Sequence, residues 1–173
     1  MNIYGFSPFG YEGAMVQVEV DLRRGAPAFD LIGLADSECS SAMERVREGM
    51  KACGYGFPSE RILISLTPAD LKKEGRGFDL PIAMAIYCAQ NKSVNKDVLV
   101  MGAIDSIVKI DYVRGVYAAC QNAKSMGINE CYVPKENAWE AHRAGMAIVH
   151  SVECLKDAFE TIRRDFILNG EEE

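Results

Sequence analysis

Apolar and polar side chains alternate along residues 14–22, a pattern that predicts a half-buried β-strand. The turn sequence RRGAP follows, and we expect residues 28–34 to form the returning strand of a hairpin. From Asp36 onward, apolar residues recur at steps of three and four, which predicts a helix capped by Asp36 or Ser37 and ended by Gly54. The apolar face of this helix consists of Cys39, Ala42, Met43, Val46, Met50 and Cys53.

Along the remainder of the chain, the alternation typical of strands and the three- and four-residue spacing typical of helices follow one another. A strand is predicted at residues 60–68, a helix from Asp79 to Gln90, and a hairpin around Ser106. Further along, the pattern predicts a helix over 113–123, a strand at 130–134, a helix over 135–145, a strand at 146–151 and a helix over 155–166. Because hairpins come first and strands later alternate with helices, we expect an α/β fold of the α+β type with a mixed sheet.

The length of 173 residues suits one domain, which we expect to span residues 1–168 and to be followed by a disordered acidic tail at 169–173. A composition of 49% hydrophobic and 25% charged residues is ordinary for a globular protein. The first residues lack the pattern of a signal peptide, and no stretch reaches the roughly 18 apolar residues of a membrane span. We therefore expect a cytoplasmic protein with no membrane partner.

The usual metal-binding patterns are missing from the sequence. Six cysteines are scattered singly without a CxxC pair, so they predict packed thiols rather than zinc ligands or a disulfide framework. His142 and His150 are the two histidines; His142 lies on a predicted helix, His150 ends an apolar run, and neither belongs to a metal-site pattern. The formal net charge of −6 argues against a dedicated nucleic-acid module, although it leaves room for a local basic patch.

The segment TPADLKKEGRGFDLPIA at residues 67–83 leads a charged, glycine-containing loop into the helix predicted at Asp79. Loops of this kind hold phosphate or present a nucleophile. A P-loop needs GxxxxGK[ST], whereas Phe78 and Asp79 follow the last glycine here, so this chain carries no P-loop. A nucleic-acid contact is a weaker hypothesis, because the basic residues of the loop are balanced by acidic ones. The basic residues are Lys72, Lys73 and Arg76, and the acidic ones are Asp70, Glu74 and Asp79.

Three segments carry a family resemblance, and they read GYEGAMVQVEVDLRRGAPAFDLIGL, LTPADLKKEGRGFDLPIA and YVPKENAWEA. Together they resemble the N-terminal domain of magnesium-chelatase-related (ComM/YifB-type) AAA+ proteins, over about residues 3–162. Ala35 departs from the family, which often has proline there, and this affects only a turn. The resemblance implies a ribosomal protein S5 domain 2-like fold of the Lon-protease-like type.

In Lon-type proteases, the corresponding loop ends in a nucleophilic serine that a lysine on a later helix activates. The resemblance maps the serine position to Asp79 and the lysine position to Tyr117. Serine is absent from residues 66–92 and lysine from 110–123, so a shifted alignment does not restore the pair. A serine nucleophile needs a base to activate it. We therefore expect a degenerate catalytic site without catalytic residues.

Other residues of this region have alternative interpretations. Thr67 and Cys88 are the nearby substitutes for a nucleophile, but neither has an identifiable base. Asp79 is expected to cap the backbone N–H groups of its helix, with a contact to Arg76 or Arg114 as the alternative. Tyr117 is expected to be a packed aromatic residue.

The resemblance implies a non-catalytic accessory or oligomerisation domain, without a cofactor of its own. The complete parent would add an AAA+ module that binds ATP and Mg²⁺, form a hexameric ring and act on DNA in branch migration or competence. Candidate partner or DNA contacts in this chain are Lys72, Lys73, Arg76 and Arg114. The competing hypothesis is a divergent peptidase or other hydrolase on the same fold, and a metal-chelatase subunit ranks below both.

Overall fold

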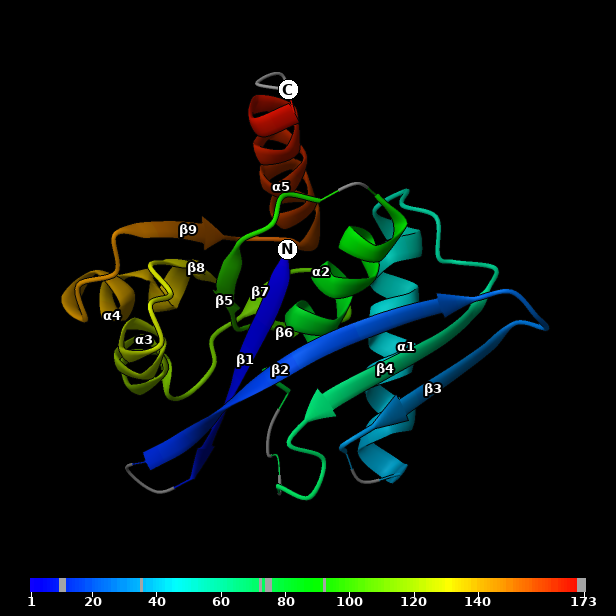
Figure 1. Ribbon diagram of the computed structural model, residues 1–173, viewed down its shortest axis with the longest axis horizontal. Coiled ribbons are helices and arrows are strands. Elements are labelled where there is room, and N and C mark those ends of the chain that lie inside the picture. Colours follow the sequence, from blue (N-terminus) through cyan, green and yellow to red (C-terminus); the bar gives the residue numbers. More distant parts are fainter. Residues whose placement is uncertain (10–11, 35, 72, 74–75, 92, 171–173) are drawn as a thin grey trace.

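The computed structural model describes residues 1–9, 12–34, 36–71, 73, 76–91 and 93–170. Its main element is a seven-stranded sheet in the order β3-β4-β2-β1-β5-β8-β9 (Figure 1). The strands are β1 (Asn2–Phe9), β2 (Glu12–Arg23), β3 (Ala28–Ile32), β4 (Arg61–Thr67), β5 (Asp97–Val100), β8 (Glu130–Pro134) and β9 (Ile148–Val152). Strand β2 is antiparallel to both of its neighbours, and every other adjacent pair is parallel. The predicted mixed α/β sheet is therefore confirmed.

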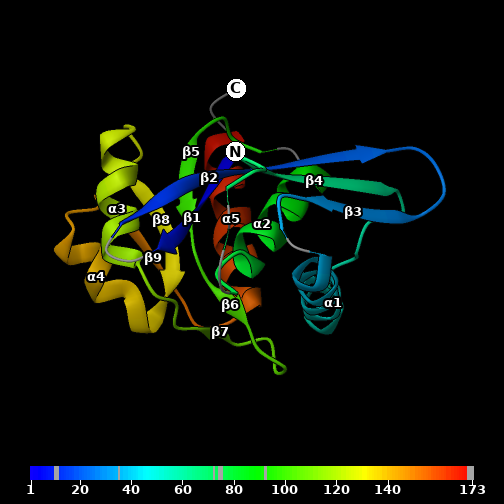
Figure 2. The ribbon, with the colours of Figure 1, turned by 90° about the horizontal axis from the view of Figure 1, so that it is seen from below.

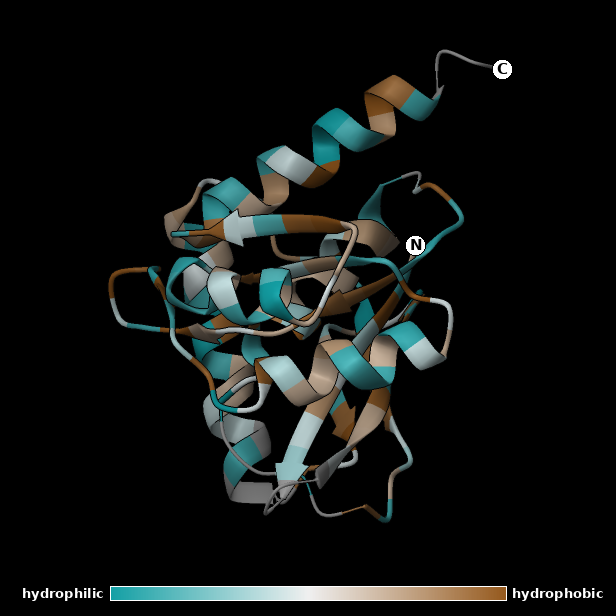
Figure 3. Ribbon diagram, turned by 90° about the vertical axis from the view of Figure 1, so that its left-hand side faces the viewer, coloured by the Kyte–Doolittle hydropathy of each residue, from teal (hydrophilic) through white to brown (hydrophobic). Residues whose placement is uncertain are grey.

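Helices cover the two faces of the sheet unequally (Figures 1 and 2). They are α1 (Asp36–Ala52), α2 (Asp79–Gln90), α3 (Val116–Ser125), α4 (Ala138–Arg143) and α5 (Leu155–Gly170), with a short 3-10 turn η1 (Lys135–Asn137) before α4. One core cluster joins α1, α2 and α5 to one face, and a second cluster joins α3 and α4 to the other face. Figure 3 shows α5 with turns that change between hydrophilic and hydrophobic colours, as an amphipathic helix should.

The sheet has two halves that differ in how they are covered. In the enclosed half, formed by β1, β5 and β8, consecutive residues are buried, because side chains on both faces meet helices. In the open half, formed by β2, β4 and β3, burial alternates along β4 and β3. The outer face of the open half carries polar residues such as Glu19, Asp21 and Arg61, which are exposed.

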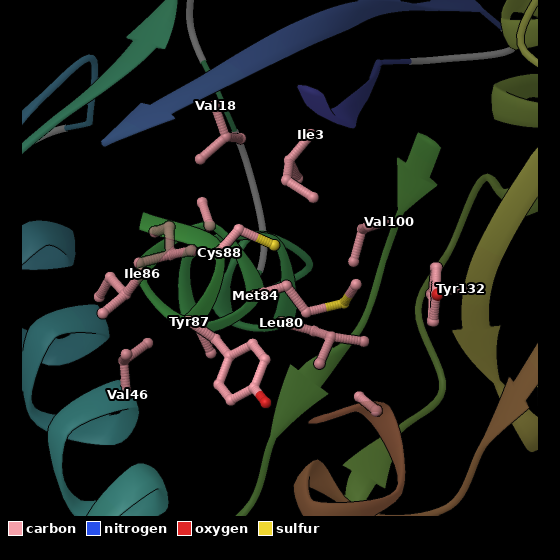
Figure 4. Packing of buried hydrophobic residues seen from close by; sticks show 14 of the residues in the cluster. Ile3, Val18, Val46, Leu80, Met84, Ile86, Tyr87, Cys88, Val100 and Tyr132 are labelled. Carbon is pink, nitrogen blue, oxygen red and sulfur yellow. The ribbon is translucent and has the colours of Figure 1, made fainter. Parts of the chain in front are cut away.

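Helix α2 lies in the centre of the main core (Figure 4). Its sequence DLPIAMAIYCAQ is apolar on every side, and all residues from Asp79 to Cys88 are buried. Figure 4 shows the α2 side chains between Val18 of β2, Val46 of α1 and Val100 of β5. A helix that is hydrophobic all round belongs in an interior, which explains this position.

Several predicted elements are confirmed, including the helix over 79–90 and the strands at 14–22, 60–68 and 130–134. The predicted hairpin of residues 28–34 with 14–22 is wrong, because β4 lies between β3 and β2. The hairpin around Ser106 is confirmed as the pair β6 (Ala103–Ile104) and β7 (Ile110–Asp111), while β5 joins the main sheet instead.

Three further outcomes concern the ends of elements. Gly54 has a φ of 78°, in the left-handed region expected where a helix ends. Helix α5 continues to Gly170, so residues 169–170 are helical rather than part of a disordered tail. The proposed caps of α1 involve side chains outside the described part of the chain, as do residues 171–173.

Candidate functional site

Asp79 is the only charged residue of α2, and its side chain is 1% exposed. Its carboxylate accepts two hydrogen bonds from Arg45 of α1, with Nε at 2.8 Å from Oδ2 and Nη2 at 2.9 Å from Oδ1. The N–H of Ile104 donates a third hydrogen bond to Oδ2, at 3.1 Å. This paired geometry is the strongest form of a carboxylate–guanidinium contact. The carboxylate is thus fully engaged by the protein itself.

The protonation of Asp79 reflects two opposed effects. Burial raises the pKa of the Asp79 carboxyl above its usual value, because a low-dielectric interior disfavours the charge. The hydrogen bonds from Arg45 and Ile104, together with the charges of Arg45 and Arg76, offset part of this rise. Nε of Arg76 lies 4.0 Å from Oδ2 of Asp79. The site is therefore a buried acid that depends on its arginine partners.

The expected capping role of Asp79 is wrong. The N-cap residue of α2 is Phe78, and no side chain makes a capping hydrogen bond there. Instead, the first turn is joined to a neighbouring segment, since the N–H of Leu80 donates to the carbonyl of Gly102 at 3.0 Å and the N–H of Gly102 donates to that of Gly77 at 3.2 Å. A Cβ on Gly102 would lie 2.8 Å from a methyl group of Ile110, so only glycine fits this approach. With the backbone satisfied in this way, the carboxylate is free to pair with Arg45.

The alternative interpretation, in which Asp79 contacts an arginine, agrees better with the structure, but it named Arg76 and Arg114 rather than Arg45. Arg76 contributes through its charge, whereas Arg45 makes the hydrogen bonds. Among the ion pairs of the described residues, none joins Asp79 to Arg114. Sequence reasoning missed Arg45, although a signal existed. A carboxylate that precedes nine apolar positions needs a cation, and Arg45 lies at the edge of the apolar face that includes Ala42 and Val46.

Tyr117, at the mapped lysine position, is not packed as expected. Its side chain is 43% exposed on α3, and its hydroxyl accepts a hydrogen bond from Nε2 of Gln121 at 3.2 Å. No hydrogen bond between described residues joins it to Asp79. The two mapped positions therefore do not form a coupled pair.

The substitutes for a nucleophile differ in their surroundings. Cys88 is buried in α2, and burial raises the pKa of its thiol to about 11, so the thiol form prevails near neutral pH. Thr67 is exposed at the end of β4. Within the described residues, neither side chain has a hydrogen bond to a His, Lys, Asp or Glu side chain.

The candidate partner contacts differ in how accessible their side chains are. Lys73 is 4% exposed, and its ammonium group donates to the carbonyls of Pro68 and Leu71, so it holds its own loop and is excluded as a surface contact. Lys72 lies outside the described residues. Arg76 has a half-exposed side chain that donates to the carbonyl of Ile104, and Arg114 is exposed.

Arg76 lines three pockets in this region, and two of them also contain a second candidate residue. One, of about 330 Å³, is lined by Arg45, Asp79 and neighbouring residues of α1. The other, of about 460 Å³, has Phe6, Met101 and Val113 on its apolar walls and Arg76 and Arg114 among its polar lining residues. An apolar pocket with a few charged groups at its edge is the usual form of a binding site.

The described part of the chain contains neither a cluster of metal-ligand side chains nor a membrane-spanning helix. No group of three or more His, Cys, Asp or Glu side chains there could hold a metal ion. His150 does have an acidic neighbour that the sequence did not suggest, since its Nε2 lies 2.7 Å from Oε1 of Glu130. Cys88, Cys120 and Cys131 are buried free thiols, as predicted. No described helix has the length and apolar character to cross a membrane.

The fold and the site define a mixed α/β domain whose loop-to-helix junction holds a buried ion pair. Comparison with known proteins gives its family. The family model described as subunit ChlI of Mg-chelatase matches residues 18–137. The chain therefore belongs to the Mg-chelatase-related family that includes ComM- and YifB-type proteins.

Three relatives illustrate the similarity. The competence protein ComM of Haemophilus influenzae is 30% identical over 176 aligned residues, which cover 98% of this chain and 33% of that protein. An uncharacterised protein of Mycobacterium tuberculosis is 33% identical over 149 residues, covering 84% of this chain and 30% of its own length. The uncharacterised protein YifB of Escherichia coli is 32% identical over 114 residues, which cover 66% of this chain and 22% of that protein. The chain thus spans about a third or less of the relatives that it matches.

Proposed function

We propose that this chain is a non-catalytic accessory and oligomerisation domain of a Mg-chelatase-related ATPase. The supporting observation is the pairing of Asp79 with Arg45 at the position where the resemblance to Lon-type proteases places a nucleophile. A carboxylate held by three hydrogen bonds has no role as an attacking group, and Tyr117 offers no base nearby. The S5-like and Lon-like description of the fold is part of this proposal.

The second part of the proposal concerns the activity of the longer protein. An AAA+ module outside this chain would bind ATP and Mg²⁺, assemble as a hexameric ring in the cytoplasm and act on DNA. Membership of the Mg-chelatase-related family and the match to a relative named as a competence protein support this assignment. Of the three candidate contacts to DNA that the structure describes, Arg76 and Arg114 are exposed.

A peptidase assay tests the non-catalytic role. The purified chain, incubated with unfolded casein and with short fluorogenic peptides, should release no more product than buffer alone. Thr67→Ala and Cys88→Ala are the matched controls, because they remove the two remaining hydroxyl or thiol candidates. Turnover by the unmodified chain that either substitution abolishes would establish the competing peptidase or hydrolase function.

The assignment of nucleotide binding to another module has its own test. Titration calorimetry of this chain with Mg-ATP should show no heat of binding, because residues 67–83 lack the P-loop pattern. A longer chain, extended along the natural reading frame, should bind Mg-ATP through a Walker A motif beyond Glu173. Micromolar binding by the 173-residue chain, or an extension without such a motif, would contradict the proposal.

A further inference from the structure

The β6–β7 hairpin projects from the body of the molecule at the bottom of Figure 2. Its turn is held by its own hydrogen bonds. The N–H of Asp105 donates to the carbonyl of Lys109 at 3.0 Å, and Oδ1 of Asp105 accepts from the N–H groups of Ile107 at 2.9 Å and Lys109 at 2.8 Å. An aspartate that accepts from its own turn in this way fixes the turn geometry. The tip of the hairpin is thus a preformed structure.

Two residues at this tip are unusual. Val108 has a φ of +60°, a left-handed conformation that is a genuine outlier for a β-branched residue. It is held there by packing against the main core and by its carbonyl, which accepts from the N–H of Leu155 at 3.0 Å. Its neighbour Ile107 is 73% exposed, more than any other large hydrophobic residue in the described chain. Val108 is half-buried and held by the core, so its strained backbone fixes the position from which the exposed Ile107 projects.

The strands of the same hairpin also line the apolar pocket of about 460 Å³. Ala103 of β6 and Asp111 of β7 belong to its wall, together with the buried residues Phe6, Met101 and Val113. Each copy of the chain therefore carries, on one rigid hairpin, both a protruding isoleucine and part of an apolar hollow. The hollow has the volume of small-ligand sites, which is ample for one isoleucine side chain.

The charges around the two features are complementary. Asp105 of the hairpin is half-buried, and its Oδ1 is engaged in its own turn, which leaves Oδ2 for a partner; the positive charge of Lys109 lies 3.8 Å from the carboxylate of Glu136. The pocket presents Arg76 and Arg114, with Asp111 as its one acidic lining residue. Arg114 has no ion-pair partner among the described residues, so its guanidinium is free to meet a carboxylate.

We propose that the hairpin of one copy seats Ile107 in the Phe6–Met101–Val113 pocket of a second copy, with Asp105 facing Arg114 of that copy. This inference rests on the proposed function, to which it adds the residues of the self-contact. A single-stranded nucleic acid is the competing occupant of the pocket. The net charge of −6 and the presence of Asp111 oppose a polyanion, whereas a single aspartate with an isoleucine fits both charges and shape.

Sedimentation equilibrium of the full 173-residue chain tests the contact, with Ile107→Ser as the hairpin variant and Arg114→Glu as the pocket variant. Both residues are exposed, so both variants should melt at the wild-type temperature. Leu168→Ser is the matched control, because Leu168 of α5 is 70% exposed and lies outside the proposed contact. Wild type and Leu168→Ser should self-associate equally, and the two test variants should associate about tenfold or more weakly, as loss of a central contact residue does.

Mixing the two variants gives the decisive measurement. Ile107→Ser keeps an intact pocket and Arg114→Glu keeps an intact hairpin, so a mixture contains one complete contact and should form a 1:1 complex more tightly than either variant alone. A wild-type chain that stays monomeric near millimolar concentration, or a mixture that associates no better than its components, would overturn the proposal. So would binding of a labelled 20-nucleotide DNA strand that Arg114→Glu abolishes while Ile107→Ser changes nothing. None of these outcomes affects the peptidase and ATP tests, so the two proposals fail separately.

Discussion

The enclosed and open halves of the sheet are built from similar strands but differ in what lies on them. In the enclosed half, β8 is buried at all five positions, since α3 and α4 pack on one face and α2 and α5 on the other. In the open half, β4 alternates between buried and accessible positions, with Ile62, Ile64 and Leu66 facing α1 and α2. The difference shows that continuous and alternating hydrophobicity report the number of covered faces rather than the presence of a strand.

The Arg45–Asp79 ion pair connects helices α1 and α2, which pack beneath the sheet. Arg45 belongs to α1, beneath the open half, while Asp79 begins α2 and also accepts from Ile104, next to the enclosed half. Because the carboxylate is buried and its partner only 27% exposed, the pair joins the layers at a site from which water is largely excluded. The pair therefore adds a contact between α1, the start of α2 and the Ile104 segment to the β1–β2 pairing that already joins the two halves of the sheet.

Removing the Arg45–Asp79 ion pair should lower the free energy of unfolding more than any other change considered below. Asp79→Ala leaves Arg45 without its partner and should lower the free energy of unfolding by about 3–5 kcal/mol, as removal of one partner of a buried pair does. Asp79→Ser should be no better, because serine would recover stability only at a capping position, and no side chain caps this helix. Urea denaturation measures both values. If Asp79→Ser recovered most of the stability lost in Asp79→Ala, Asp79 would act as a helix cap, and the stabilising role of its ion pair with Arg45 would be wrong.

A double-mutant cycle gives the control for this prediction. Arg45→Ala leaves a buried carboxylate, so the double variant Asp79→Ala with Arg45→Ala should lose less than the sum of the single losses. Additive losses would mean that the two side chains act independently, contrary to the hydrogen bonds between them.

Two leucines, one in each half of the sheet, test the comparison directly. Leu99 of β5 is 0% exposed and faces the α3–α4 cluster, while Val98 and Val100 beside it face the main core. Leu99→Ala should therefore cost about 2–5 kcal/mol. Leu63 of β4 lies half-buried on the outer face, beside a groove of about 610 Å³, and Leu63→Ala should cost less than about 1 kcal/mol. Equal losses in urea melts would show that the outer face of the open half is covered in solution.

Sequence patterns predicted the open half better than the enclosed half. The alternation along residues 14–22 identified β2, because its outer face meets water. Strand β1 was missed: Asn2–Phe9 contains Gly5 and Pro8 and lies between β2 and β5, with burial at Ile3, Gly5, Phe6 and Ser7. A strand that is covered on both faces loses the period-2 signal. Pairing was also beyond local patterns, since β4 enters between β2 and β3 from more than 30 residues away.

The surroundings of Asp79 could not be predicted from the sequence. The sequence drew attention to Asp79, but the cap was the local interpretation, and the actual partner Arg45 lies 34 residues away in sequence. Lys73 was interpreted as a surface cation, whereas the loop folds around its ammonium group. Long-range pairs of this kind depend on the packing of α1 against α2, which no single segment encodes.

Ion pairs of the enclosed half should contribute an intermediate amount. Lys96 contacts Glu130 of β8 at 2.9 Å and also pairs with Asp165 of α5. Burial lowers the pKa of Lys96, but the hydrogen bonds to Asp165 and Glu130 raise it by more, so that the pKa lies above 10.5. Lys96→Met should therefore cost about 1.5–3 kcal/mol near neutral pH, the range for hydrogen bonds to charged groups.

The sign of the pH dependence follows from the raised pKa of Lys96. The stabilisation is fully present below the unfolded-state pKa of about 10.5 and is lost as the pH rises through the higher folded-state value. The difference in unfolding free energy between wild type and Lys96→Met, measured in urea, should be constant from pH 7 to 9 and should shrink above about pH 10.5. A difference that grows with pH would contradict this account.

The smallest effect is expected for an ion pair of the open half. Asp30 of β3 and Arg61 of β4 are 3.2 Å apart, but their side chains are 50% and 57% exposed. Water and salt screen such a pair, so a double-mutant cycle with Asp30→Asn and Arg61→Gln should give a coupling free energy below about 0.5 kcal/mol. The coupling should fall further when the salt concentration is raised from 0.05 to 0.5 M, since the charges stay in solvent. A coupling above about 1.5 kcal/mol that is insensitive to salt would mean that the edge of β3 is covered by another chain. In that case, the outer face of the open half would be an interface rather than a solvated face. The alternating burial along β3 and β4 would then describe the free monomer only.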